Sequence, residues 1–324
     1  EKMVEEFPTI VELDKKVDRL KSHLDAIEVL RIYNIAPEIA FFNSCEEEYQ
    51  KTNDGTNVST RNLVKGKEIL NNICRKFISN PQNSTTRESI IRLIEDLDYI
   101  CTAIPGISKE YTNEILLKHS LGSRFYNVGK TIMENNILPP NVVEEIVIAA
   151  AIDYYNSAAG SHDQIMETAK EILNLAPLLN DDVLNELHLI EASRLVASLG
   201  SSMLPLQIRL IENKIDVINR VLQDNPRNYL NVSSIQKLLF LLIPRASMTK
   251  KKQVQMFLIK TAIREGDFII AANYFITLFQ MLQKGDLDKS KNKEQKEQHD
   301  ENSSYLDSVT VKEAIELIKN IFHY

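Results

Sequence analysis

The sequence has few of the residues from which covalent or metal cross-links are built. Its 324 residues include three cysteines, Cys45, Cys74 and Cys101, each within an apolar stretch of helical spacing. An odd number of widely spaced cysteines fits neither a disulfide framework nor a zinc site. We therefore expect reduced, buried thiols, as in a cytosolic protein.

Long apolar runs are also missing, and we expect no signal peptide. Apolar runs such as Leu238–Ile243 are far shorter than the roughly 18 residues that a membrane span needs. We therefore expect a soluble protein without a membrane span. Because the sequence begins at Glu1 and not at a methionine, we also expect it to be part of a longer protein.

The sequence also has no excess of basic residues over acidic ones. The net charge is −7, whereas a protein that grips nucleic-acid phosphates normally carries a basic face. The densest basic run is Lys250-Lys251-Lys252, with Arg245 nearby. We interpret it as a solvated helix start, with a phosphate or anionic-lipid patch as the alternative. The charge balance argues against nucleic acid as the main ligand.

No complete nucleotide-binding or nucleophile motif is present. The run Val128-Gly129-Lys130-Thr131 resembles the end of a P-loop, but that loop needs four residues between its two glycines. Here Gly122 and Gly129 have six residues between them, and no apolar strand precedes them. Gly-rich dinucleotide loops and Gly-x-Ser-x-Gly elbows are also missing. We interpret 128–131 as part of a helical surface.

The six histidines do not have the spacing of known helical metal motifs. None stands in His-Glu-x-x-His or Glu-x-x-His spacing. The pair His162-Asp163 would suit a helical metal phosphohydrolase if His119 and Asp216 joined it, but a helix cap is the simpler interpretation. Two acidic runs are interpreted as a helix start and a solvated face: Asp181-Asp182 and Glu46-Glu47-Glu48. We predict no catalytic, cofactor-binding or metal-binding residues.

Helical periodicity dominates the chain. Apolar residues of the first predicted helix recur every three or four positions and form one stripe, which we expect to pack against a neighbouring helix: Ile10, Leu13, Val17, Leu20, Leu24 and Ile27. No stretch has sustained period-two alternation, so no sheet is expected. Further helices are predicted at 36–51, 60–79, 86–103, 108–119, 123–135, 140–157, 162–175 and 181–199.

The C-terminal third continues this pattern. One helix with a buried stripe is predicted from Leu204 to Leu222, with Ile208, Ile211, Ile215 and Ile218 on the same face. Another is predicted from about 233 to 242. Apolar periodicity on both sides of a Gly266-Asp267 turn then predicts an antiparallel helical hairpin over 254–282.

A polar segment interrupts the pattern near the end of the sequence. Residues 284–302 are almost all charged or amide side chains and cannot bury enough apolar surface to order the backbone. A last helix is predicted at 308–322, with Val311, Ile315, Ile318 and Phe322 on one face.

Paired helices every 35 to 45 residues predict an all-α fold, an α-solenoid of antiparallel helical hairpins, with a compact irregular bundle as the alternative. We divide the sequence into a solenoid (1–283), a disordered polar insert (284–305) and a C-terminal helix that continues the solenoid (306–324).

Three stretches together resemble the family of the neuroblastoma-amplified sequence (NBAS) protein and the yeast secretory-pathway protein thirty-nine. The most specific begins Leu204-Pro-Leu-Gln-Ile-Arg-Leu and runs on through Asn225-Pro-Arg-Asn-Tyr229. Residues 7–30 are similar to the family's opening helix. Residues 262–274, with Gly266-Asp267 at the turn, are similar to its closing hairpin.

The resemblance implies a non-catalytic scaffold subunit of an endoplasmic-reticulum tethering complex that captures retrograde vesicles from the Golgi. Its implied partners are a second tether subunit and the N-terminal regions of SNARE proteins, with no cofactor, small-molecule substrate or nucleic acid. Its implied location is cytoplasmic, peripheral at the endoplasmic-reticulum membrane. The alternatives are a kinetochore rod-type scaffold and a helical metal-dependent hydrolase. The sequence assigns no partner-binding residues, although open array ends at 1–7 and 311–322 are the places we expect for them.

Overall fold

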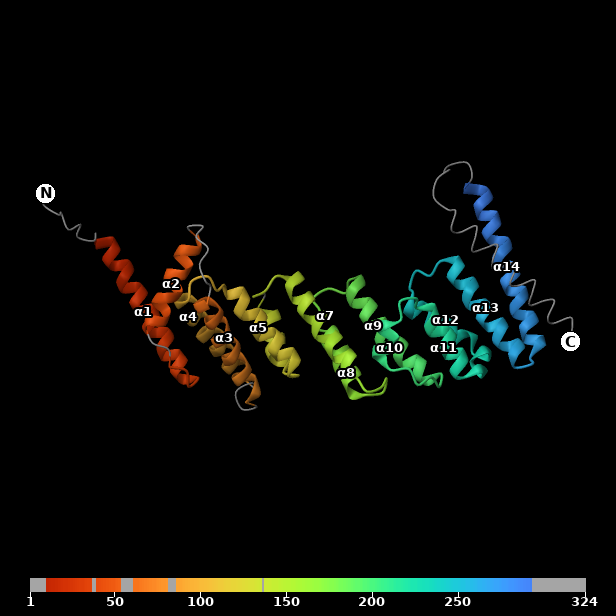
Figure 1. The fold of residues 1–324 in the computed structure, drawn as a ribbon, viewed down its shortest axis with the longest axis horizontal. Coiled ribbons are helices and arrows are strands. Elements are labelled where there is room, and N and C mark those ends of the chain that lie inside the picture. The colour runs from red at the N-terminus through yellow and green to blue at the C-terminus, as the bar shows by residue number, and fades with distance from the viewer. Residues whose placement is uncertain (1–9, 37–38, 54–60, 81–85, 136, 293–324) are drawn as a thin grey trace. The chain divides into compact units, whose positions relative to one another are not determined.

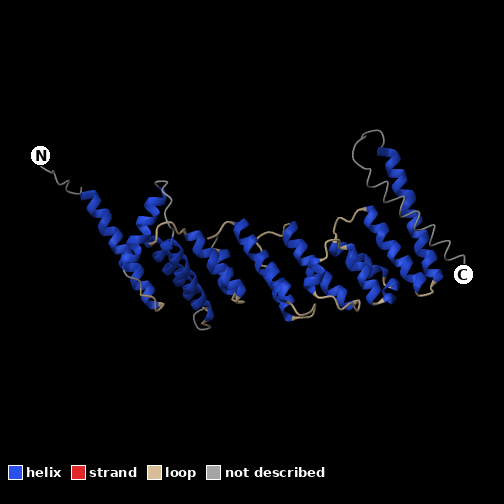
Figure 2. Ribbon diagram, in the orientation of Figure 1, coloured by secondary structure: helices blue, strands red, loops and turns tan. Residues whose placement is uncertain are grey.

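The computed structural model describes residues 10–36, 39–53, 61–80, 86–135 and 137–292. Within these ranges the chain forms fourteen α-helices, one short 3-10 helix and no strand (Figure 2). The predicted fold class, an all-α solenoid of antiparallel helical hairpins, is confirmed. The predicted helices from 60 to 199 agree with the observed ones to within a few residues at each end.

The chain folds into two compact units that share its middle segment. Unit 1 comprises residues 1–151 and 171–179, and unit 2 comprises residues 152–170 and 180–324. The backbone therefore crosses between the units three times. The first two crossings lie inside helices α7 (Pro140–Ser157) and α8 (Gln164–Leu173).

Unit 1 is built from α1 to α6, the start of α7, the end of α8 and the residues that follow it to 179 (Figure 1). Helix α1 packs on α4 and α2, and α5 packs on α3, α4 and α6. The bounds are α1 Ile10–Ile32, α2 Ile39–Asn53, α3 Arg61–Ser79, α4 Arg87–Ala103, α5 Lys109–Gly122 and α6 Tyr126–Glu134. Fully buried side chains such as Phe42, Leu70 and Leu97 form its core.

The three cysteines belong to this core. Cys45, Cys74 and Cys101 are free and buried, as predicted. Burial raises the pKa of the Cys74 thiol to about 12 and those of Cys45 and Cys101 to about 11. A thiol with so high a pKa is a poor nucleophile, because the thiolate is the reactive form.

Unit 2 contains the end of α7, most of α8 and all later described helices. The later bounds are α9 Asp181–Ser198, α10 Pro205–Leu210, α11 Ile215–Asp224, the 3-10 helix η1 Pro226–Leu230, α12 Val232–Leu242, α13 Met248–Arg264 and α14 Phe268–Asn292. Its core includes Ile208, Ile218, Ile235 and Leu258. Helices α13 and α14 form the predicted antiparallel hairpin, and Gly266 takes a positive φ of 78° at the turn.

Side-chain caps mark where several helices begin. The hydroxyl of Thr86 accepts a hydrogen bond from the Ser89 backbone N–H, and Ser108 does the same for Tyr111. The Asn180 side chain accepts one from Val183, and Ser247 accepts one from Lys250. Each cap satisfies a backbone donor that the first helical turn leaves without a partner.

The prediction of one helix from Leu204 to Leu222 is wrong. The chain makes two helices, α10 and α11, separated by residues 211–214. Leu204 is exposed and Ile211 is half-buried, so the predicted buried stripe is interrupted at these positions. The apolar spacing continues through the break and therefore conceals it.

Most of the C-terminal region whose division was predicted lies outside the described residues. Helix α14 continues to Asn292 and so overlaps the start of the segment predicted to be disordered. The rest of that segment and the predicted helix at 308–322 lie outside the described residues. The division at 283 and 305 stays a prediction.

Candidate functional site

The run that resembles the end of a P-loop is helical. Residues 128–131 lie within α6, where Val128, Gly129 and Thr131 are buried. The Thr131 hydroxyl donates to the Asn127 carbonyl, and Lys130 lies 3.8 Å from Glu134. Because the backbone amides are engaged in a helix, they cannot curl around a phosphate.

The polar residues considered for metal binding serve local structure. Asp163 accepts hydrogen bonds from the backbone N–H groups of Ala159 and Ile165 at 3.1 and 3.0 Å, just before α8, as predicted for a cap. The His119 ring contacts the Asn71 side chain, and burial followed by Arg75 lowers the His119 pKa. Asp216 accepts from the Asn213 side chain. Among the described residues, no three His, Cys, Asp or Glu side chains are grouped to hold a metal ion.

The two acidic runs have different structural environments. Asp181 and Asp182 lie in the first turn of α9, where their charge favours the helix dipole, as predicted. The solvated-face interpretation of Glu46–Glu48 is wrong for two of its three residues. Glu46 forms an ion pair with Arg19 at 2.7 Å, and Glu48 accepts from both nitrogens of Asn62 at 2.9 Å. Glu48 thus caps the start of α3.

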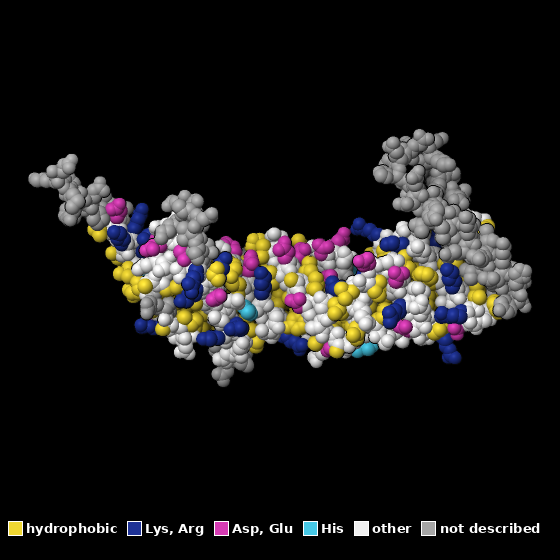
Figure 3. Space-filling model, viewed as in Figure 1, with side chains coloured by type: hydrophobic (Ala, Val, Ile, Leu, Met, Phe, Trp, Pro, Cys, Tyr) yellow, Lys and Arg dark blue, Asp and Glu magenta, His cyan; other side chains and the backbone are white. Residues whose placement is uncertain are grey.

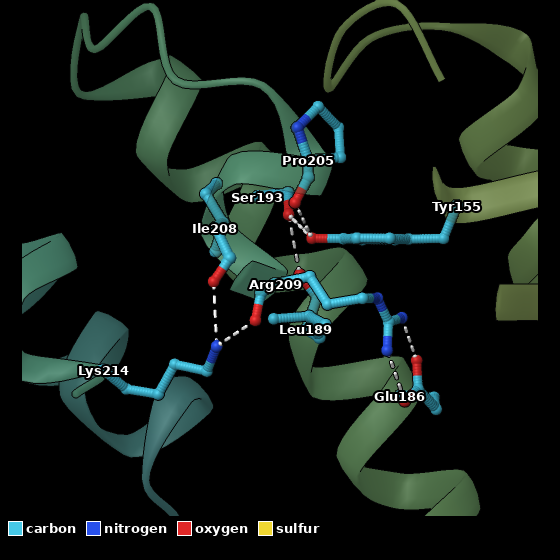
Figure 4. A network of polar contacts seen from close by, with 8 residues as sticks. All are labelled: Tyr155, Glu186, Leu189, Ser193, Pro205, Ile208, Arg209 and Lys214. Atoms are coloured by element: carbon cyan, nitrogen blue, oxygen red, sulfur yellow. Dashed lines mark hydrogen bonds and ion pairs between the residues drawn. The ribbon is translucent and has the colours of Figure 1, made fainter. Parts of the chain in front are cut away.

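A buried polar network in unit 2 joins α7, α9 and α10 (Figure 4). The Tyr155 hydroxyl lies 2.7 Å from the Ser193 hydroxyl and donates to the Pro205 carbonyl at 3.0 Å. The guanidinium of Arg209 covers the Tyr155 ring and binds both carboxylate oxygens of Glu186. Burial raises the pKa of Tyr155 to about 12, which keeps the hydroxyl protonated as a donor. The network binds three helices together, and the Arg209 Nε is a buried atom of it without a hydrogen-bond partner.

The residues that carry the family resemblance also have structural roles. The Asn228 side chain is buried and donates to the Leu199 carbonyl at 2.7 Å, and Asn225 donates to the same carbonyl at 3.1 Å. The Tyr229 hydroxyl donates to Asp267 at the turn of the α13–α14 hairpin. This stretch therefore fastens α9 and the hairpin to the segment between α11 and α12.

The first candidate surface is the apolar stripe of α1, whose side chains do not pack in the core of the chain. Leu13, Val17, Leu20 and Leu24 are 48%, 64%, 49% and 50% exposed. In Figure 3, hydrophobic side chains follow the outer edge of α1, at the left of the view. The prediction that this stripe packs inside the chain is therefore wrong for these four residues. Their three- and four-residue spacing matches one seam of a coiled coil.

The C-terminal half of α1 holds the helix on unit 1. Ala26 and Leu30 are fully buried, and the buried His23 ring stacks on Phe42 with centroids 5.2 Å apart. Burial lowers the pKa of His23, Glu46 opposes this shift and Arg19 adds to it. The Tyr33 hydroxyl donates to Asp96 of α4 at 2.9 Å. Helix α1 is thus anchored by its C-terminal half, whereas residues 12–21, which include Leu13, Val17 and Leu20, are all exposed.

The second candidate surface is a pocket of about 630 Å³ in unit 2, lined by α12, α13, one residue of α14 and the loop between α12 and α13. Its apolar walls include Leu239, Val254 and Leu258, and Arg245 and Lys251 also line it. The predicted solvated basic run is therefore only partly solvated, because Lys251 is exposed and Lys252 is buried.

Sequence patterns could not reveal this pocket, because its walls come from segments up to 45 residues apart, from Gln236 to Met281. The α1 stripe was visible as a pattern, but its exposure was not. Helical periodicity is the same whether a stripe faces a neighbouring helix or solvent.

None of the described helices combines the length and the apolar character that a membrane crossing requires.

Comparison with known proteins finds a matching family and a human relative. The model of a family described as secretory pathway protein Sec39 matches residues 59–306, which is more than half of the chain. The human NBAS subunit of the NRZ tethering complex is 28% identical over 130 residues, which are 40% of this chain and 6% of the human protein. The chain therefore spans only a small part of the length of that relative. The resemblance seen in the sequence is confirmed.

Proposed function

Because this chain belongs to the Sec39 family of secretory pathway proteins, we propose that it is a non-catalytic scaffold subunit of an endoplasmic-reticulum vesicle-tethering complex. In this proposal it acts in Golgi-to-ER retrograde transport, on the cytoplasmic side of the endoplasmic-reticulum membrane. It binds a second tether subunit and the N-terminal regions of SNARE proteins, without a cofactor.

The observation that carries the proposal is the exposed stripe of α1. Isolated exposed apolar residues are common on protein surfaces, but a continuous row along one helix marks an interaction site. A partner helix can lay its own apolar face along Leu13, Val17, Leu20 and Leu24, which recur with the period that helix pairing requires. A tethering subunit needs such a surface for its neighbours.

The uses of the polar side chains support the non-catalytic part of the proposal. Asp163 caps a helix start, Tyr155 joins three helices, and the thiol pKa values are raised by burial. Catalytic groups are instead expected to have pKa values near the working pH and to face a cleft.

The test is a titration of the chain with the purified tether subunit and, separately, with SNARE N-terminal regions. Val17→Asp and the double variant Val17→Asp/Leu20→Asp place charge on the stripe and should weaken one of these complexes at least tenfold. Ile269→Asp is the matched control, because Ile269 is a 78% exposed apolar residue in the first turn of α14.

Unfolding curves of all variants should be compared first, because only a loss of binding at unchanged stability counts. Chelator should have no effect, and added salt should weaken an apolar helix contact only modestly. Absence of binding to both partners would contradict the tethering proposal. Binding that survives both α1 variants would show that another surface carries it.

A further inference from the structure

The pocket of unit 2 has an apolar interior that is open at its edge. Leu239, Val254 and Leu258 are at most 6% exposed, whereas Phe240 on the edge is 55% exposed. The volume of about 630 Å³ can hold more than one large side chain. An exposed aromatic beside a buried apolar wall is typical of a surface that receives an apolar anchor from a partner.

The edge of the pocket is basic although the chain is acidic. Arg245 and Lys251 line the pocket, and α13 begins beside them at Met248 with its positive dipole end. Arg245 lies 3.6 Å from Asp181, but both side chains are largely exposed, so solvent screens that pair and leaves Arg245 able to bind elsewhere. In a chain of net charge −7, this edge is locally basic, and it favours acidic segments over basic ones.

The pocket also offers amide groups. Gln236 lines it and is exposed. Gln255 is buried, and its side-chain nitrogen donates to the Tyr274 carbonyl of α14 at 3.0 Å, which fixes one wall. A wall held in this way is largely formed before a ligand arrives, which lowers the entropic cost of binding.

From these features we propose that the pocket docks an acidic amphipathic segment of a partner protein. Bulky apolar side chains of the segment contact Phe240 and the buried wall, and its carboxylates meet Arg245 and Lys251. The inference rests on the proposed scaffold function, to which it adds a second docking site and the chemistry of its ligand.

The test uses a displayed library of random 15-residue peptides, selected on the full chain. The selected peptides should carry large apolar residues three or four positions apart with Asp or Glu between them. Their affinity is then measured by fluorescence anisotropy on variants. Arg245→Glu/Lys251→Glu should weaken binding at least tenfold and should itself select peptides rich in Lys and Arg. Phe240→Ser should weaken the acidic peptides through the loss of apolar contact.

Two matched controls keep the test specific. Lys237→Glu changes an exposed lysine of α12 that does not line the pocket, and it should leave peptide affinity within about twofold. Val17→Asp on α1 should also leave it unchanged, so the result is independent of whether the tethering proposal holds.

Three outcomes would overturn the inference. The first is that the selected peptides show no enrichment in acidic residues, and the second is that their binding is insensitive to both pocket variants. The third is that no peptide is selected while a fluorescent fatty acid binds and Arg245→Glu/Lys251→Glu abolishes its binding, which would make the pocket a lipid site.

Discussion

Lys214 satisfies three backbone carbonyls at once. Its ammonium group donates to the carbonyls of Ile208 and Arg209 at 2.9 and 2.7 Å, where α10 ends (Figure 4). It also donates to the Ile211 carbonyl at 2.7 Å. Burial, followed by the nearby Arg209 charge, lowers the Lys214 pKa. Because Lys214 satisfies carbonyls at the end of α10, it stabilises the break between α10 and α11.

We expect Lys214→Met to lower the free energy of unfolding by about 1–2 kcal/mol, because the carbonyls lose a charged donor in a partly buried setting. Lys237→Met, at an exposed lysine on α12, should change it by less than about 0.5 kcal/mol. Chemical denaturation of both variants measures the difference. Equal stability of the two would show that water replaces the ammonium group without cost.

His23 makes stability depend on pH. Its folded-state pKa is lowered, chiefly by burial, whereas the unfolded histidine binds a proton near pH 6.5. The unfolded state therefore binds more protons below that pH, and stability falls as the pH decreases from 7 to 5.

His23→Leu removes this contribution. Over the same range its unfolding free energy should fall less steeply than that of the wild type, by at most about 1.4 kcal/mol per pH unit. Denaturation curves at several pH values measure both slopes. Parallel slopes would mean that His23 is protonated equally in both states.

At the scale of helices, α11 carries the buried part of the stripe that the sequence assigned to one longer helix. Ile218 is fully buried in the core of unit 2, while Ile211 is half-buried in the break before α11. Ile218→Asp should cost about 3–5 kcal/mol, because it buries an unpaired carboxylate. Ile211→Asp should cost about 1 kcal/mol, since its carboxylate can reach solvent. Thermal unfolding compares the two, and a larger effect at Ile211 would restore the single-helix prediction.

Helix positions could be predicted from the sequence because caps, prolines and apolar periods are local signals. The α13–α14 hairpin is an example, since Gly266 and Asp267 determine its turn locally. The break at 211–214 could not be predicted, because it depends on Lys214 reaching carbonyls up to six residues away. The exposure of the α1 stripe depends on how much of α1 packs on the rest of unit 1, and the pocket depends on three helices meeting. Both features depend on tertiary packing, for which the local sequence gives no signal.

At the scale of the whole molecule, the polar segment after α14 offers a test of the proposed division of the chain. Replacing residues 293–302 with a four-residue Gly/Ser link should change stability by less than about 1 kcal/mol, because each doubling of loop length costs roughly 0.6 kcal/mol. The melting temperature should then shift by no more than about 3 °C. A larger loss would show that this segment packs on the folded chain and is not a linker.

The interleaving of the two units affects how this chain can be recombined with its relatives. In a chimera that switches from one parent to the other at 151/152, residues 171–179 of unit 1 come from a different parent than the rest of that unit. In a chimera that switches at 179/180, the same is true of residues 152–170 of unit 2. The second chimera takes Tyr155 from one parent and its partners Ser193 and Pro205 from the other. It likewise separates the origins of Glu167 and Arg194, which form an ion pair. Chimeras joined at one point therefore combine incomplete cores from both parents, and genes of this kind are expected to exchange these halves rarely. Exchange of the whole 152–179 segment would not avoid the problem, because that segment contributes to both units.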